Sequence, residues 1–244
     1  MTTLSLPQLT VKFSVAEWQQ CIVLVLGGRT PAIPWLKKIT AEREVWAVDK
    51  GIDICKQANI APQKLIGDGD SASLAAWKWG QAQGAQIHRF PPEKDFTDTQ
   101  LALKLLSAKP ATLAIVTGAF GGRADHFFST LYSAACQPFP CVLADETETL
   151  FFLRDAMETT VECHAPTAAL SLLPLSDEVN GVTLQGTHWP LNHATLRQNS
   201  PQAISNVLQE GRSFRVSITA GMLGVYHLSE AGVWAAAERL KDMA

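Results

Sequence analysis

The sequence predicts an α/β fold followed by an all-β region. Over residues 21–143, short apolar runs alternate with segments whose apolar residues recur at helical spacing. Beyond residue 145 the helical spacing weakens, and short strand-like runs separated by Gly, Pro and Asn replace it. Alternating strands and helices favour βαβ units with a mostly parallel sheet and flanking helices, whereas many short strands favour a β-sandwich or roll. We therefore expect an α/β domain over residues 1–145 and a β-rich domain over residues 146–244.

The individual elements follow from the same patterns. Apolar runs predict strands in the first domain at residues 21–26, 44–48, 64–66, 86–90, 113–117 and 141–143. Helical spacing between them predicts helices over residues 31–39, 52–58, 74–83, 97–108 and 125–135. In the second domain we expect strands at residues 150–153, 159–163, 168–173, 181–184 and 214–218, and a terminal helix over residues 231–243.

Composition excludes several function classes. The 244 residues are 47% hydrophobic, which is enough for a sizeable core, and the net charge of −3 comes without a basic stripe that would bind nucleic acid. The N-terminal residues lack the basic and apolar regions of a secretory signal, and no apolar run is long enough to span a bilayer. Five cysteines without a CxxC pair favour reduced thiols in a cytoplasmic protein.

Polar clusters follow the predicted strands of the first domain. In an open parallel sheet, ligands bind outside the carboxyl ends of the strands, so these clusters are expected to meet at one edge. In chain order they are Gly27-Gly28-Arg29, Asp49, Gly67-Asp68-Gly69-Asp70-Ser71, Lys94-Asp95-Phe96-Thr97-Asp98 and Gly118-Ala119-Phe120-Gly121-Gly122-Arg123-Ala124-Asp125-His126.

Asp68 and Asp70 stand two residues apart in a turn whose central Gly69 lets the backbone approach a ligand. Magnesium prefers oxygen ligands and bridges substrate phosphates through one or two carboxylates. The alternative is an ordinary Asp-Gly turn in which Ser71 or Asp70 caps the helix that begins at residue 74. By itself this motif supports both interpretations equally.

The Lys94–Asp98 segment opens a predicted helix. One interpretation makes Asp95 and Asp98 ligands of a metal or its waters and Lys94 a phosphate contact. The other makes Thr97 or Asp95 a helix cap, with acidic residues in the first turn as in many helices.

A glycine-rich turn with one arginine follows the strand at residues 113–117. The backbone N–H groups of Gly121 and Gly122 and the start of the next helix can hold an anion, and Arg123 can grip phosphate oxygens in a fork. The alternative is a tight turn with a surface arginine, in which Asp125 caps the helix.

In the second domain Trp189, Ser205 and Asn206 are candidate binding residues. An aromatic face beside small polar groups suits a flat heteroaromatic or cationic ligand. On composition alone, a core tryptophan and a turn Ser-Asn pair are the favoured explanation.

Taken together, these segments resemble the thiamine pyrophosphokinase family. The family pattern has an acidic segment after the second strand, then GDxDS, KDxTD, GxxGGRxDH, GxxWxL and a Ser-Asn pair. The chain has them in that order, as Asp49-Lys50-Gly51, residues 67–71, residues 94–98, residues 118–126, Gly186–Leu191 and Ser205-Asn206. Gly69 stands where the family usually has a bulky apolar residue, and Lys50 where it has a small one.

The resemblance implies transfer of the terminal pyrophosphoryl group of ATP to the hydroxyethyl oxygen of thiamine, with Mg²⁺ as cofactor. It also implies a homodimer. The resemblance assigns the metal to Asp68, Asp70 and Asp95, which form the catalytic set with Arg123. The residues then expected at ATP are Asp49, Lys94, Thr97, Asp98, Gly121, Gly122 and Arg123, and those expected at thiamine are Asp125, Trp189, Ser205 and Asn206.

Three alternatives remain at this point. The first is a pyrophosphokinase with another acceptor, such as a hydroxymethyl-pterin. The second is a glycosyl- or nucleotidyltransferase that uses Asp68 and Asp70 alone, which leaves the later motifs unexplained. The third is a regulator that binds thiamine or nucleotide without catalysis.

Overall fold

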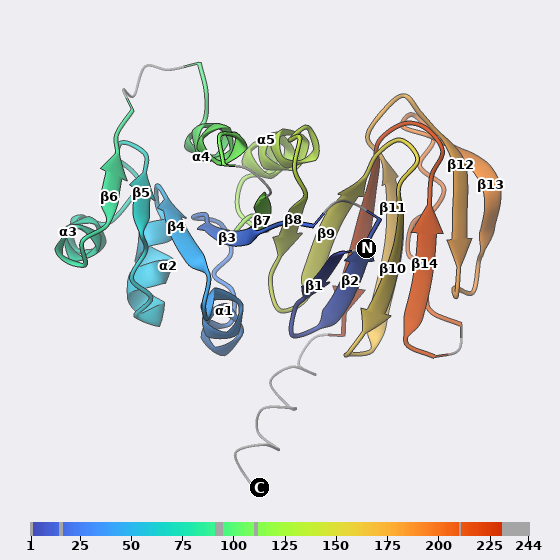
Figure 1. Ribbon diagram of the computed structural model, residues 1–244, viewed down its shortest axis with the longest axis horizontal. Helices are drawn as coiled ribbons and strands as arrows, with labels where there is room; N and C mark the ends of the chain where they lie inside the picture. The colour runs from blue at the N-terminus through green and yellow to red at the C-terminus, as the bar shows by residue number, and fades with distance from the viewer. Residues whose placement is uncertain (1, 15–16, 91–94, 110–111, 210, 231–244) are drawn as a thin grey trace, which may run out of the picture. The chain divides into compact units, whose positions relative to one another are not determined.

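The computed structural model describes the chain except for residues 1, 15–16, 91–94, 110–111, 210 and 231–244. The chain divides into two compact units (Figure 1). Trp18–Asp145 form an α/β unit, and Met1–Glu17 together with Glu146–Ala244 form a β-rich unit. The predicted terminal helix over residues 231–243 lies outside the described residues.

The first seventeen residues correct the predicted division of the chain. The change at residue 145 is where we expected it, but Met1–Glu17 belong to the β-rich unit rather than to the α/β unit. The reason is strand pairing: β2 (Leu9–Phe13) pairs antiparallel with β10 (Glu158–Cys163), and β1 (Thr2–Ser5) pairs with β2. Alternate residues of β2 are buried, as expected of a strand with one face on a core.

The α/β unit contains a parallel sheet in the order β8-β7-β3-β4-β5-β6. Its strands are β3 (Gln20–Val25), β4 (Glu44–Val48), β5 (Lys64–Ile66), β6 (Gln86–His88), β7 (Thr112–Thr117) and β8 (Cys141–Ala144). Its helices are α1 (Ile33–Thr40), α2 (Gly51–Ala58), α3 (Leu74–Ala82), α4 (Asp98–Ser107) and α5 (Ala124–Ala135). Each predicted element of this unit is present, with ends that differ by one or two residues.

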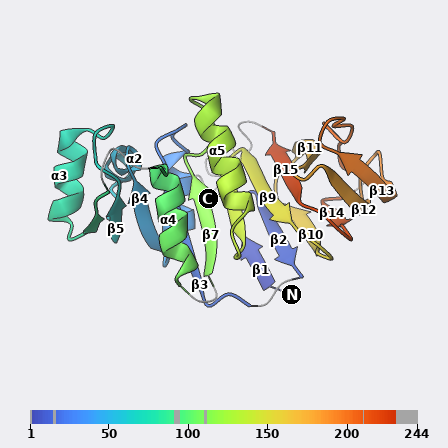
Figure 2. The same cartoon turned by 90° about the horizontal axis from the view of Figure 1, so that it is seen from above.

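The order in which successive strands are added to the sheet reverses at β3, although β3 and β7 run parallel. From β3 the chain runs outward through β4, β5 and β6, and it then returns to the other side of β3 to form β7 and β8. The helices divide accordingly: α4 and α5 cover one face of the sheet, and α1 and α2 lie on the other (Figures 1 and 2). Such a reversal is the topological switch point at which open parallel sheets bind ligands. All six residues of β7 are buried, so its unbroken apolar run reflects burial on both faces.

The β-rich unit contains one sheet in the order β1-β2-β10-β14-β12-β13 and strands in the order β11-β15-β9. Its later strands are β9 (Glu148–Leu153), β11 (Thr167–Pro174), β12 (Glu178–Gln185), β13 (Leu191–Arg197), β14 (Ser213–Ser217) and β15 (Leu223–Ser229). Phe13 on β2 meets Phe151 on β9 edge to face, with ring centroids 5.6 Å apart. The two sets of strands therefore pack against each other as a sandwich, as predicted.

Four strands of this unit were not predicted: β1, β2, β13 and β15. β2 alternates apolar and polar residues, but its partner β10 is far along the chain, and β1 pairs only with β2. β13 carries a single fully buried residue, Leu196, so it has almost no apolar pattern. No helix among the described residues is long and apolar enough to cross a membrane.

His227 on β15 lies in a buried polar group of the β-rich unit. Its Nε2 atom lies 2.9 Å from Thr167 Oγ1 and 3.5 Å from Cys163 Sγ, and its buried Nδ1 atom has no hydrogen-bond partner. Burial lowers the pKa of His227 to about 4. The imidazole is therefore neutral at pH 7.

This histidine makes the stability of the protein depend on pH. An unfolded histidine binds a proton below its usual pKa of about 6.5, whereas folded His227 does so only near a pKa of about 4. Between these values the unfolded state binds more protons, so the free energy of unfolding falls as the pH is lowered. Between pH 7 and about pH 5, His227 should lower the free energy of unfolding by roughly 2 kcal/mol. We predict that His227→Gln removes this part of the decrease, as measured by urea unfolding.

His164→Gln, which changes an exposed histidine next to β10, is the matched control. It should leave the dependence of unfolding free energy on pH unchanged. An identical dependence in both variants would contradict the role assigned to His227.

Candidate active site

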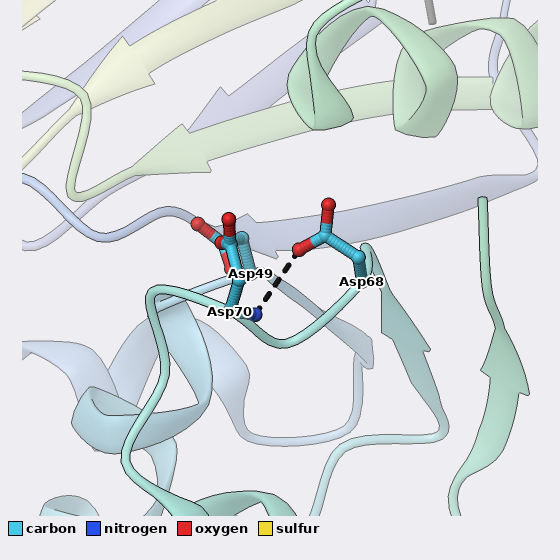
Figure 3. Close-up of side chains that lie close together, drawn as sticks. All are labelled: Asp49, Asp68 and Asp70. Atoms are coloured by element: carbon cyan, nitrogen blue, oxygen red, sulfur yellow. Dashed lines mark hydrogen bonds between the residues drawn. The ribbon is translucent and has the colours of Figure 1, made fainter. Parts of the chain in front are cut away.

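Three carboxylates meet at the carboxyl edge of the parallel sheet. Asp49 directly follows β4, and Asp68 and Asp70 follow the adjacent strand β5. One carboxylate oxygen from each of the three residues lies within 4.8 Å of the other two (Figure 3). We call Asp49, Asp68 and Asp70 the acidic triad. Its members meet because the Asp49 N–H continues the β4–β5 ladder to the Ile66 carbonyl, at 2.8 Å.

Glycines allow the triad's turn to pack closely. Gly67 has φ +133°, and a Cβ atom there would lie 3.3 Å from Asp98 Cγ and 3.4 Å from Asp49 Cβ. Gly69 has φ +80°, and a Cβ atom there would lie 3.0 Å from the Trp77 ring. Trp77 on α3 thus occupies the space next to position 69, which explains why a small residue stands there.

Hydrogen bonds within the turn fix the two later carboxylates. The Asp70 N–H donates to Asp68 Oδ1 at 3.1 Å, and the Ser71 hydroxyl donates to Asp70 Oδ1 at 2.9 Å. The alternative in which Ser71 or Asp70 caps α3 is wrong, because Ser73 is the cap and accepts from the Ala76 N–H. The carboxylates of the turn are therefore not used as helix caps.

Asp49 is a partly buried carboxylate whose surroundings disfavour its negative charge. Burial raises its pKa, and the negative charges of Asp98 and Asp70 raise it further, against hydrogen bonds from the Lys50 backbone and Ser71. Its Oδ1 atom is buried without a hydrogen-bond partner. Crowded carboxylates with an unsatisfied buried oxygen fit an oxygen-seeking cation such as Mg²⁺. The acidic triad thus has the donors and the charge that a divalent cation requires.

The start of α4 contributes Asp98 to the same place. Asp98 lies next to Gly67, and its charge reaches Asp49. Thr97 is the N-cap of α4 in a capping box with Gln100, with bonds of 3.2 and 2.9 Å, so its side chain serves the helix. Asp95 is exposed, and the structure does not include it in the triad. Lys94 lies outside the described residues.

Two glycine-rich turns pair at the switch point. We call residues 27–29 the β3 turn and residues 118–122 the β7 turn. The Gly28 N–H donates to the Gly118 carbonyl at 2.8 Å, and the Arg29 N–H donates to the Phe120 carbonyl at 2.7 Å. A Cβ atom on Gly28 would lie 2.5 Å from the Gly118 oxygen, so only glycine fits there.

The end of the β7 turn is open. Gly121 and Gly122 have φ values of +70° and +80°, and a Cβ atom on Gly122 would meet nothing within 4 Å. Arg123 and Asp125 are exposed and form an ion pair with Nη2 and Oδ2 2.6 Å apart. The Arg123 hydrogen bond lowers the pKa of Asp125. The N-cap position of α5 is Arg123 and no side chain caps this helix, so Asp125 is not its cap, contrary to the alternative interpretation of the sequence.

The candidate residues of the β-rich unit form a group of their own. The Asn206 side-chain amide donates to the Trp189 carbonyl at 2.7 Å, and its Oδ1 accepts from the Trp189 N–H at 3.2 Å. Asn206 thus holds the backbone of Trp189, whose side chain is 59% exposed. Ser205 is exposed in a left-handed conformation, and its N–H donates to Ser171 Oγ at 3.0 Å.

Known proteins match the chain over both units. Sequence models of two domains match: "Thiamin pyrophosphokinase, catalytic domain" over residues 36–139 and "Thiamin pyrophosphokinase, vitamin B1 binding domain" over residues 158–223. The curated thiamine pyrophosphokinase of Bacillus subtilis is 31% identical over 195 residues, which are 78% of this chain and 91% of that protein. This chain belongs to the thiamine pyrophosphokinase family.

Solved structures of thiamine pyrophosphokinases share the fold. The Bacillus subtilis structure has a TM-score of 0.76 at 27% identity and covers 86% of this chain and 100% of its own. The Geobacillus thermodenitrificans structure has a TM-score of 0.75 at 27% identity, with 87% and 99% covered. The yeast structure has a TM-score of 0.72 at 14% identity over 90% of each chain, and it supports the fold alone. The predicted fold class and family are confirmed.

The candidate residues divide between the two matched domains. The acidic triad and the β7 turn lie within the catalytic-domain match, and Trp189, Ser205 and Asn206 lie within the vitamin B1 binding match. The β3 turn with Arg29 precedes the catalytic-domain match. The sequence interpretation placed Arg29 at the correct edge but gave it no role.

Asp49 provides a direct test of the triad as a cation site. Asp49→Asn keeps the shape of the side chain but removes a half-buried negative charge that the charges of Asp70 and Asp98 repel. We predict a melting temperature of the metal-free variant no lower than that of the wild type. At about tenfold excess over its dissociation constant, Mg²⁺ should stabilise the wild type by about 1.4 kcal/mol and the variant by less than half as much, as measured by calorimetry.

Asp177→Asn, an exposed position in the β-rich unit, is the control and should retain the wild-type response to Mg²⁺. A full Mg²⁺ response in Asp49→Asn would remove Asp49 from the cation site.

Proposed function

We propose that this chain transfers the terminal pyrophosphoryl group of ATP to the hydroxyethyl oxygen of thiamine, which yields thiamine diphosphate and AMP. The observation that carries the proposal is the acidic triad, which lies on the strands next to the switch point. Membership of the thiamine pyrophosphokinase family supports the same reaction.

The acidic triad is suited to binding the Mg²⁺ complex of the ATP triphosphate. Asp49, Asp68 and Asp70 would hold Mg²⁺, which neutralises phosphate oxygens and the charge that develops on the leaving AMP. Asp98 supports Asp49 from the start of α4. Asp95 remains a proposed further ligand.

The β7 turn suits the phosphate chain of ATP. The backbone N–H groups of Gly121 and Gly122 and the start of α5 offer donors to phosphate oxygens. Arg123, at the same place, offers a charged fork. Lys94 and Thr97 belong to the proposed nucleotide contacts as well.

Positioning and charge neutralisation account for most of the proposed catalysis. The hydroxyethyl oxygen of thiamine forms a bond to the β-phosphorus of ATP as the bond from that phosphorus to the α,β-bridging oxygen breaks. AMP leaves with the electron pair of the broken bond, and the hydroxyl proton passes to solvent.

The β-rich unit contains residues suited to binding the acceptor, thiamine. The exposed ring of Trp189 offers a face to the flat, cationic thiamine, and Ser205 offers a hydroxyl group. Asn206 serves this site by holding Trp189 in place, since its amide is bonded to the Trp189 backbone. Asp125 is proposed to orient thiamine. The resemblance also supports a homodimer that acts in the cytoplasm.

A product assay with ATP, Mg²⁺ and thiamine tests the proposal. We predict that the wild type forms AMP and thiamine diphosphate in equal amounts. Asp70→Asn should lower kcat/KM by about 100-fold, since it removes a charge from the metal site. Asp177→Asn should act as the wild type.

Other products would identify other functions. Turnover of a hydroxymethyl-pterin in place of thiamine would indicate a different acceptor. Binding of ATP and thiamine without AMP formation would indicate a regulator. Full activity in Asp70→Asn would contradict the metal assignment.

A further inference from the structure

Arg29 lies at the switch point of the α/β unit. It ends the β3 turn, and β3 stands between β7, which leads into the β7 turn, and β4, which leads to Asp49. Crevices at such points are where open parallel sheets bind their ligands. Arg29 therefore brings a positive charge to the edge of the sheet that also carries the β7 turn and the acidic triad.

The contacts of Arg29 fix its guanidinium group. Nε donates to Asp145 Oδ2 at 3.0 Å, and Nη2 donates to the same oxygen. Asp145 follows β8 and its side chain is 1% exposed, whereas that of Arg29 is 42% exposed. The guanidinium carbon also lies 5.8 Å from the centre of the Phe120 ring. Asp145 therefore anchors the guanidinium group, while a substantial part of the Arg29 side chain reaches solvent.

Arg29 also touches the part of the β7 turn that is proposed to bind phosphate. A Cβ atom on Gly121 would lie 2.9 Å from Arg29 Cβ, and the Arg29 N–H donates to the Phe120 carbonyl. Arg123, at the far end of this turn, is 74% exposed and pairs with Asp125 two residues along the chain. Arg29 is the better-anchored of these two arginines.

We propose that Arg29 binds the β- or γ-phosphate of ATP from the β3 turn, opposite Gly121 and Gly122, with Asp145 holding the guanidinium in place. The assignment rests on the proposed function, because it takes ATP as the substrate. It adds a phosphate contact from a segment outside the catalytic-domain match. A charged guanidinium group that a carboxylate holds in place suits phosphate oxygens.

Binding of two nucleotides by Arg29→Gln tests this role. The first is the Mg²⁺ complex of α,β-methylene ATP, which cannot release AMP, and the second is AMP, which lacks the β- and γ-phosphates. By isothermal titration calorimetry, Arg29→Gln should weaken the ATP analogue by about tenfold or more, as expected for a lost charged hydrogen bond. Its affinity for AMP should change by less than about twofold, because AMP lacks the group that Arg29 contacts.

Two further variants separate phosphate binding from a structural role. Arg43→Gln changes an arginine of the same unit that bonds the Ile39 carbonyl at 2.7 Å, and it should leave both affinities unchanged. Arg29→Gln alone removes a charged partner of buried Asp145, which can destabilise the unit. The double variant Arg29→Gln/Asp145→Asn removes both charges, and it should show the same selective loss for the ATP analogue.

Each outcome decides the assignment. An unchanged affinity of the double variant for the analogue, or an equal loss for AMP and the analogue, would overturn it. The assignment of Arg29 would also be overturned if the wild type did not bind the analogue. A wild type that binds the analogue but makes no thiamine diphosphate would contradict the proposed function while the comparison of the Arg29 variants still stands.

Discussion

The parallel pairing of β3 with β7 and of β4 with β5 is the constraint on which the candidate site depends. The hydrogen bonds continue beyond the strand ends, from Leu26 N–H to Thr117 and from Gly28 N–H to Gly118, at 2.8 Å each. The turns therefore leave the sheet side by side, and glycines let their backbones approach. The same continuation from Asp49 to Ile66 brings the acidic triad together. The backbone ladder thus positions the acidic triad and the two glycine-rich turns of the α/β unit.

The repulsion between carboxylates in this arrangement favours the binding of a cation. Burial and neighbouring carboxylates raise the pKa of Asp49, and one of its oxygens has no partner. A protein rarely keeps such a group without a function that compensates for it. A divalent cation would satisfy the oxygen and offset the repulsion at once. We therefore propose that the acidic triad is the protein's part of a cation site, which the phosphate oxygens of the nucleotide would complete.

Sequence patterns predicted the α/β unit well, because strands buried on both faces are continuous apolar runs and glycine turns mark their ends. They failed where contacts are distant in the chain: the β1–β2 hairpin was assigned to the wrong unit because its partner β10 lies over 140 residues away. They assigned the metal to Asp68, Asp70 and Asp95, whereas the carboxylates that the structure brings together are those of Asp49, Asp68 and Asp70; the metal assignment itself stays a prediction. Motif spacing does not reveal which carboxylates converge, and no pattern indicated that the Asn206 amide holds Trp189.

The most direct test of the central claim is the position of the metal with a bound nucleotide. Crystals grown with Mn²⁺ and α,β-methylene ATP would locate the ion by its anomalous scattering. We predict a peak among the carboxylates of Asp49, Asp68 and Asp70, in contact with phosphate oxygens. A peak bound by Asp95 and Asp98 without the triad, or nucleotide phosphates away from the β7 turn, would contradict the account.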